Sequence, residues 1–273
     1  MIKLIIFDLD HTTLNDSKQL SPRFLNLVTQ LQNKGIKTTF ASGRAYELVK
    51  PYALKANIDA PLILNNGALI KTVNNREPLV KKTLSEQAKT DIIKEVLAQN
   101  LPFAFYCETA FVTNDEERTN FYQIWNETYP DSFITIVQST DYAFLKHLDP
   151  YKLLIIDQNK QTFNSRYFRL KKRKDAHVTK SQDHFLDILP LNTNKGEGVK
   201  WLKDYYGYHK DEVLAFGDND NDIEMFKQVG YSVAMPNGSL AAKAAAKVIA
   251  PADSNHDGVS QVLEYLLTEK QFD

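Results

Sequence analysis

The chain has 273 residues, enough for one large domain or two smaller ones with a substantial core. Its 33 Lys and Arg balance 34 Asp and Glu, so the composition gives no sign of a nucleic-acid partner. The single cysteine excludes a disulfide framework and a cysteine-based zinc site. The N-terminal apolar run is too short for a signal peptide or a membrane span, which predicts a soluble, cytoplasmic protein with no membrane partner.

The chain opens with an apolar run from Ile2 to Phe7, interrupted only by Lys3. Such a run predicts a strand buried on both faces, as in parallel sheets flanked by helices. It leads into Asp8 and Asp10, whose side chains point the same way in an extended chain. Ligands bind at that end of strands in open α/β sheets, and two such close carboxylates call for a cation or hydrogen bonds. Asp and Thr also end strands in ordinary turns, so this motif alone leaves both interpretations open.

Helices and further strands alternate up to about residue 80. Apolar spacing predicts a helix after the Ser21-Pro22 cap and a second one from about residue 45. Buried strands are predicted at 36–41 and 62–64. The order strand, helix, strand, helix, strand is typical of a doubly wound, mostly parallel α/β sheet.

The pattern changes over residues 81–189. A helix at 85–99 precedes short strands, several of them rich in aromatic residues, at 103–106, 110–113, 151–157, 176–180 and 185–189. Strands and helices grouped in this way indicate an α+β layer. We therefore expect an inserted α+β domain at 81–189 within a core formed by 1–80 and 190–273.

The α/β pattern resumes with helices at 195–206, 240–246 and 257–267 and strands at 213–216, 231–234 and 248–249. Four polar clusters now follow a predicted strand or open a helix. They are Asp8/Asp10/Thr12, Ser42-Gly43-Arg44, Lys195-Gly196, and Gly217 through Asp222. One edge of one sheet would gather them all, and their chemical types fit phosphoryl transfer.

Each residue type has a role in that chemistry. A carboxylate nucleophile can form an aspartyl-phosphate. Asp218 can complete a Mg²⁺ site with Asp8 and the backbone carbonyl of Asp10. Ser42-Gly43 can hydrogen-bond phosphate oxygens at a helix start. Lys195 can neutralise the transferring group and keep Asp8 ionised.

The order and identity of these residues resemble the haloacid dehalogenase (HAD) superfamily, whose phosphatases carry D-x-D-x-T, a hydroxyl residue, a Lys and an acidic G-D-x-x-N-D. The resemblance is closest to the Cof-like branch. Its secondary motifs are matched by Ser42-Gly43-Arg44, Asn66-Gly67-Ala68, Val233-Ala234-Met235 with Asn237, and His256-Asp257-Gly258-Val259. The resemblance covers nearly the whole core and implies a HAD/Rossmann-like fold with an inserted cap that sets substrate specificity.

Carried over by position, the resemblance implies that Asp8 attacks phosphorus. Asp10 would protonate the leaving oxygen and then activate water, and Thr12 would orient Asp10 and its loop. The remaining implied roles are Asp222 holding Lys195 or a metal-bound water, Asn221 reaching the phosphate or such a water, and Arg44 on the substrate side.

Two positions depart from the family pattern, and one acidic residue has a structural interpretation. His11 and Asn192 stand where the family usually has glycine. Both residue types tolerate left-handed backbone angles better than most, so we expect the loops to keep their shape. We expect Asp220 to cap the helix that follows it, and Asn66 to be either a turn residue or a substrate contact.

The leading hypothesis is a Mg²⁺-dependent phosphatase of small phosphorylated metabolites, such as sugar phosphates or phosphorylated cofactors. The alternative within the same fold is a phosphomutase or phosphotransferase that returns the phosphoryl group to a sugar hydroxyl. A non-catalytic sensor of phosphorylated ligands is disfavoured because Asp8 and Asp10 are both present. We expect a monomer or a weak homodimer.

Overall fold

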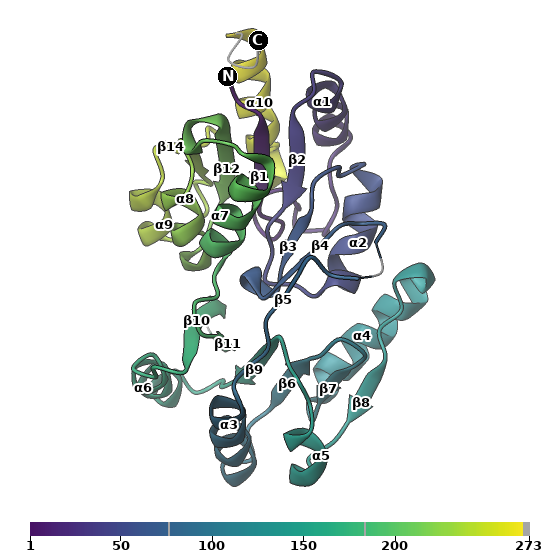
Figure 1. Cartoon of the computed structure of the whole chain (residues 1–273), viewed down its shortest axis with the longest axis vertical. Helices are drawn as coiled ribbons and strands as arrows, with labels where there is room; N and C mark the ends of the chain where they lie inside the picture. Colours follow the sequence, from purple (N-terminus) through teal and green to yellow (C-terminus); the bar gives the residue numbers. More distant parts are fainter. Residues whose placement is uncertain (76, 183, 270–273) are drawn as a thin grey trace. The chain divides into compact units, whose positions relative to one another are not determined.

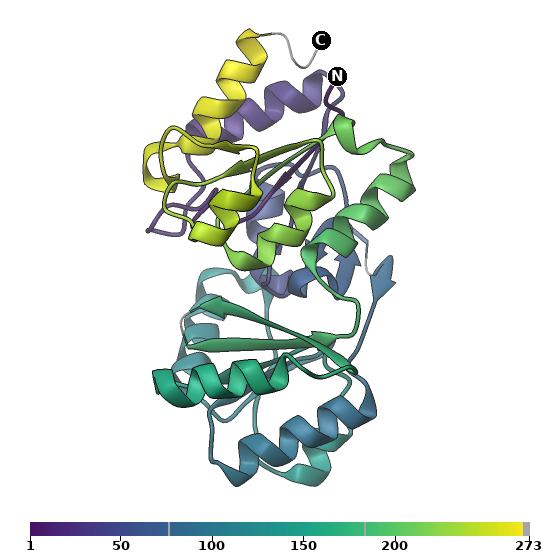
Figure 2. The ribbon, with the colours of Figure 1, turned by 90° about the vertical axis from the view of Figure 1, so that its left-hand side faces the viewer.

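The computed structural model describes residues 1–75, 77–182 and 184–269. The chain divides into two compact units (Figures 1 and 2). The core unit comprises Met1–Leu79 and Asn194–Asp273, and the inserted unit comprises Val80–Thr193. Among the described residues, no helix combines the length and the apolar character needed to cross a bilayer.

The core unit is built on a parallel sheet of five strands in the order β14-β13-β12-β1-β2. The strands are β1 (Leu4–Phe7), β2 (Lys37–Phe40), β12 (Val213–Gly217), β13 (Tyr231–Ala234) and β14 (Val248–Ile249). The first strand of the chain is thus interior, between β12 and β2, and all four of its residues are buried. This arrangement confirms the predicted α/β class.

Helices bury both faces of this sheet. They are α1 (Pro22–Asn33), α2 (Tyr46–Lys55), α7 (Lys195–Tyr206), α8 (Ile223–Lys227), α9 (Leu240–Ala245) and α10 (Gly258–Thr268). Leu4 and Ile6 belong to one apolar cluster with residues of α7 and α8. Phe7 packs instead edge-on against Phe24 of α1, with ring centroids 5.0 Å apart. Alternate residues of β1 therefore contact helices on opposite sides, which is why the strand has no polar position.

Short elements complete the core unit next to β2. The strand β3 (Leu62–Leu64) lies beside the end of β2 through a parallel bridge between Ala41 and Ile63. It leads into the 3₁₀ turn η1 (Asn65–Gly67) and pairs antiparallel with β4 (Leu69–Lys71). The other 3₁₀ turns are η3 (Lys210–Glu212), η4 (Asp220–Asp222) and η5 (Ser254–His256).

The inserted unit holds a six-stranded sheet in the order β10-β11-β9-β6-β7-β8. Its strands are β6 (Phe103–Tyr106), β7 (Phe111–Thr113), β8 (Ile136–Gln138), β9 (Lys152–Ile156), β10 (Ala176–Gln182) and β11 (Phe185–Pro190). Its remaining elements are β5 (Val80–Lys81), α3 (Glu86–Ala98), α4 (Glu116–Thr128), α5 (Tyr142–Lys146), α6 (Lys160–Leu170) and the turn η2 (Pro130–Ser132). Strand β8, which pairs parallel to β7, had no sequence signal because it is short and only partly buried.

Candidate active site

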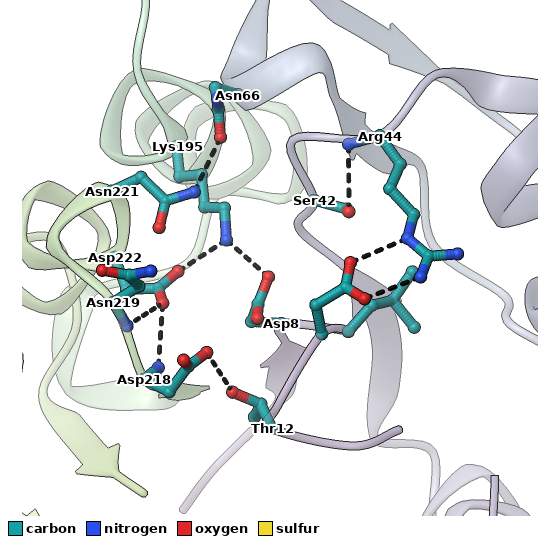
Figure 3. A network of polar contacts seen from close by, with 12 residues as sticks. Asp8, Thr12, Ser42, Arg44, Asn66, Lys195, Asp218, Asn219, Asn221 and Asp222 are labelled. Atoms are coloured by element: carbon teal, nitrogen blue, oxygen red, sulfur yellow. Dashed lines mark hydrogen bonds and ion pairs between the residues drawn. The ribbon is translucent and has the colours of Figure 1, made fainter. Parts of the chain in front are cut away.

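The carboxyl ends of β1 and β12 lie side by side and bring two of the predicted clusters together. The strands are parallel, with Phe7 opposite Phe216, so the residues that follow them emerge at the same edge. The N–H of Asp8 donates to the carbonyl of Phe216 at 3.0 Å. Across the same gap, the Thr12 hydroxyl donates to Asp218 Oδ1 at 2.9 Å (Figure 3). The two acidic motifs, 206 residues apart at this hydrogen bond, therefore form one site.

Lys195 is the cation at the centre of the site. Its Nζ lies 2.5 Å from Asp8 Oδ1 and 2.6 Å from Asp222 Oδ1 (Figure 3). The side chain is 1% exposed, since it enters from the first turn of α7. Gly196 allows the first turn of α7 to pack closely on α8, because a Cβ at that position would stand 2.4 Å from the carbonyl oxygen of Glu224. Burial disfavours the charged amine, but the carboxylates of Asp222 and Asp8 outweigh it and raise the pKa of Lys195.

Asp222 ties the acidic loop to this lysine. Its Oδ2 accepts the backbone N–H groups of Asp218, at 2.9 Å, and Asn219, at 3.0 Å. The other oxygen accepts from Lys195, so both oxygens of this fully buried carboxylate are engaged. A Cβ at residue 217 would lie 2.5 Å from Cγ of Asp222, which explains why this first position of the acidic motif is glycine. Asp222 therefore holds Lys195 and the loop in place.

Three buried carboxylates converge here against one ammonium group. Ligand atoms of Asp8, Asp218 and Asp222 lie within 4.8 Å of one another. Burial raises the pKa of Asp8 to about 7, with Lys195 opposing the rise. Burial and the nearby charges of Asp8 and Asp222 raise the pKa of Asp218 to about 9. The three carboxylates and one lysine thus carry two negative charges in excess when ionised, which is costly in a buried site.

This excess charge fits a divalent cation. In the part of the chain that the structure describes, Oδ2 of Asp8 and Oδ2 of Asp218 accept no hydrogen bond. Two carboxylate oxygens at adjacent strand ends are the ligand type that hard divalent ions prefer. Asp8 and Asp218 would hold such an ion, and Asp222 would act through Lys195 and the loop. The carbonyl of Asp10 stays a predicted third ligand.

The side chain of Asp10 is engaged away from this cluster. Its carboxylate accepts from Arg44 Nε at 2.7 Å and Arg44 Nη2 at 2.6 Å, and from Lys18 Nζ at 3.1 Å. Burial favours the neutral acid, but Arg44 and then Lys18 outweigh it and hold the pKa of Asp10 well below its usual range. Arg44, predicted to lie on the substrate side, is thus a partner of Asp10 in this structure.

The predicted phosphate-binding residues lie in two connected loops. Ser42 Oγ accepts the N–H of Arg44 at 3.1 Å, and its own N–H donates to the carbonyl of Ile63 at 2.8 Å. Asn221 Nδ2 donates to Asn66 Oδ1 at 3.0 Å, and this hydrogen bond orients the Asn221 side chain. The Asn66 amide in turn lies against Gly43, where a Cβ would be 3.1 Å from its Oδ1. Figure 3 shows Ser42, Asn66 and Asn221 around Asp8 and Lys195.

Three contacts differ from, or add to, the sequence interpretation. Thr12 donates to Asp218 and not to Asp10. Asn219, not Asp220, is the N-cap of η4, and Asp220 accepts instead from Ser239 Oγ at 2.7 Å. The expectation for Asp220 was therefore wrong. Thr13 Oγ donates to the Asp8 carbonyl at 2.7 Å. The only sequence signal for this contact was the position of Thr13 next to Thr12.

His11 and Asn192 do adopt the left-handed backbone that glycine favours. Their φ angles are 59° and 54°. The His11 carbonyl also accepts Nδ2 of Asn237 at 3.0 Å, which fixes the loop after Asp10. Both residues thus adopt the left-handed angles that their types tolerate, and the shape of the loops relative to the family stays a prediction.

The backbone of His11 makes a testable stability prediction. The variant His11→Gly removes left-handed strain, so its free energy of unfolding is expected to equal or exceed that of the wild type by up to about 1 kcal/mol. His11→Val, which is β-branched, is expected to lose about 1–2 kcal/mol. Urea unfolding of the three proteins measures both values. A glycine variant less stable than the valine variant would contradict the backbone argument.

Comparison with known proteins agrees with this site. The family model described as haloacid dehalogenase-like hydrolase matches residues 5–263. A protein of Mycoplasma genitalium is 30% identical over 275 residues, covering 97% of this chain and 99% of its own length. The 5-amino-6-(5-phospho-D-ribitylamino)uracil phosphatase YwtE of Bacillus subtilis is 26% identical, covering 98% and 99%.

Solved structures give the same result. The crystal structure of a haloacid dehalogenase-like hydrolase from Bacteroides thetaiotaomicron superposes with a TM-score of 0.82 at 25% identity, covering 97% of this chain and all of that one. The fold, the four polar clusters at one sheet edge and the family match over nearly the whole chain agree. The chain therefore belongs to the haloacid dehalogenase-like hydrolase family.

Proposed function

We propose that the protein is a Mg²⁺-dependent phosphatase that hydrolyses small phosphorylated metabolites through an aspartyl-phosphate on Asp8. The observation that carries the proposal is the contact of Lys195 with both Asp8 and Asp222, beside Asp218. Lys195 offsets the burial that otherwise makes Asp8 a poor anion, and so favours the ionised nucleophile. A bound Mg²⁺ would supply further charge neutralisation for the phosphate oxygens.

The reaction has two steps. In the first, an Asp8 oxygen attacks phosphorus while the bond to the leaving oxygen breaks and Asp10 gives that oxygen its proton. In the second, the Asp10 carboxylate takes a proton from water, whose oxygen attacks phosphorus as the bond to Asp8 breaks. Inorganic phosphate leaves, and Asp10 holds the proton for the next turnover. A substrate phosphate brings negative charge close to Asp10, which offsets Arg44 and Lys18 and favours the protonated acid.

The other site residues have supporting roles in this proposal. Ser42, the Gly43 amide and Asn221 bind the oxygens of the phosphoryl group. Thr12 fixes Asp218, and Asp222 fixes Lys195. In this proposal the inserted unit determines which phosphorylated metabolite is bound. The reacting groups of the core unit act only on its phosphoryl group.

A screen of phosphate release tests the function. The panel holds sugar phosphates, nucleotides and phosphorylated cofactors, with Mg²⁺ or with EDTA. It includes 5-amino-6-(5-phospho-D-ribitylamino)uracil, because three relatives at 26–27% identity bear the name of phosphatases of that compound. Inorganic phosphate released only with Mg²⁺ is the expected result. An isomerised sugar phosphate without inorganic phosphate would identify a mutase, and no turnover of any compound would contradict the proposal.

We expect bound Mg²⁺ to raise the folding stability by an amount that depends on pH. The pKa values of Asp8 and Asp218 lie above the ordinary 3.8, at about 7 and about 9. The folded state thus holds protons that the unfolded chain releases, so the metal-free protein loses stability as pH rises from about 4 towards about 9. Mg²⁺ binds the ionised carboxylates and opposes this loss.

The measurement is the melting temperature with Mg²⁺ and with EDTA at a series of pH values. The difference between the two is expected to grow from about pH 5 to about pH 8, and to shrink strongly in Asp218→Asn. A difference that is constant with pH, or unchanged in Asp218→Asn, would place the ion elsewhere.

A further inference from the structure

The turn after Asp10 holds a lysine in a fixed position. Lys18 has a left-handed backbone with φ of 56°, and its N–H donates to the carbonyl of Asn15 at 2.8 Å. The side chain of Asn15 closes the turn by accepting the N–H of Gln19 at 2.9 Å. From the other side, the Tyr52 hydroxyl donates to the carbonyl of Lys18 at 3.1 Å. The backbone that carries this lysine is therefore anchored both within the turn and to α2.

The ammonium group of Lys18 reaches one particular oxygen of Asp10. Lys18 Nζ and Arg44 Nη2 both donate to Asp10 Oδ1, at 3.1 Å and 2.6 Å. Arg44 Nε alone donates to Oδ2, at 2.7 Å. The guanidinium of Arg44 lies over the ring of Tyr52, 5.6 Å from its centroid, so the same tyrosine contacts both cationic residues.

The count of lone pairs distinguishes the two oxygens. A carboxylate oxygen accepts about two hydrogen bonds. Among the described residues Oδ1 accepts two N–H groups and Oδ2 accepts one. Without Lys18 the two oxygens would be equivalent in this respect. Lys18 thus makes Oδ2 the oxygen with room for a further partner.

We propose that Lys18 is a positioning residue for Asp10, which orients the carboxylate so that Oδ2 exchanges the proton with the leaving oxygen and with water. The inference rests on the proposed function, since it assumes that Asp10 is the acid and base. Lys18 itself touches no reacting atom in this proposal. Its side chain is 46% exposed, so the ion pair contributes little to folding stability and its loss is expected to leave the fold intact.

The test compares Lys18→Met and Lys18→Arg with Lys55→Met, an exposed lysine on α2 that gives the same change of net charge. The quantity is kcat/KM, which reports the steps up to departure of the leaving group, for an alkyl phosphate and for p-nitrophenyl phosphate. An alkoxide leaves only with a proton, whereas nitrophenolate leaves without one. Any effect of charge on phosphate binding acts equally on both substrates.

Lys18→Met is expected to lower kcat/KM for the alkyl phosphate about 10-fold or more, and for p-nitrophenyl phosphate less than about 2-fold. Lys18→Arg is expected to restore most of the loss, and Lys55→Met to match the wild type. Equal losses on both substrates, or no loss, would overturn the inference. The inference would also be overturned if Lys18→Met lowered the melting temperature, and Lys18→Arg restored that temperature but not the wild-type ratio of kcat/KM between the two substrates.

The outcomes separate this inference from the proposed function. A wild type that releases phosphate, with an inactive Asp8→Asn and a Lys18→Met equal to Lys55→Met, leaves the function standing and removes only the role of Lys18. A wild type without any phosphatase activity, or an active Asp8→Asn, removes both.

Discussion

Asp8→Asn is expected to abolish turnover while leaving the protein folded and at least as stable in EDTA. Asparagine keeps the size of the side chain but cannot form an aspartyl-phosphate, so we expect kcat to fall about 10⁴-fold or more. Stability is expected to hold, because the change removes one of three buried carboxylates that repel one another. Lys195 keeps its contact with Asp222.

Phosphate release and the melting temperature, measured on the same preparations, test this pair of effects. Asp204→Asn, an exposed carboxylate on α7, is the matched control and is expected to behave as the wild type. Metal-dependent turnover by Asp8→Asn at the wild-type rate would remove the nucleophile assignment. A large loss of stability would show that the charge of Asp8 contributes more to folding than its burial costs.

Lys195→Met is expected to damage both stability and activity. It leaves Asp8, Asp218 and Asp222 buried without a cation, and removing one partner of a buried ion pair costs about 3–5 kcal/mol. The loss is expected to be largest at alkaline pH in EDTA and smaller at acid pH, where the raised pKa values leave Asp8 and Asp218 protonated.

A double-mutant cycle separates the charge effect from simple loss of packing. Adding Asp222→Asn to Lys195→Met is expected to recover part of the stability, because one buried charge disappears, but none of the activity. Lys200→Met, an exposed residue on the same helix, is the control. Additive losses in the double variant would show that Lys195 and Asp222 do not interact in the folded state.

The central strand and its polar end were predictable because each signal is local in the sequence. The apolar run before Asp8 gives a strand buried on both faces, and parallel pairing then fixes where Asp8 and Asp218 emerge. The cap Ser21 accepts the N–H of Phe24 as the Ser-Pro signal indicates. The left-handed angles of His11 and Asn192 likewise follow from residue type at a known turn.

The partners of individual side chains were not predictable in this way. The engagement of Asp10 by Lys18 depends on a left-handed turn and on side-chain torsions that no spacing encodes. The contact between Asn221 and Asn66 joins residues 155 positions apart, in loops whose approach depends on the packing of α7. Asn219 competes with Asp220 for the same cap, and either residue type suits it.

The covalent step is tested most directly by trapping it. Wild-type protein turning over a phosphorylated substrate is quenched in acid within milliseconds, digested with pepsin at acid pH to preserve the acyl phosphate, and analysed by mass spectrometry. We predict that the peptide containing Asp8 gains the mass of one phosphoryl group, that fragmentation assigns it to Asp8, and that Asp8→Asn shows none. Turnover with that peptide unmodified at every quench time, or with the phosphoryl group on another residue, would contradict the account.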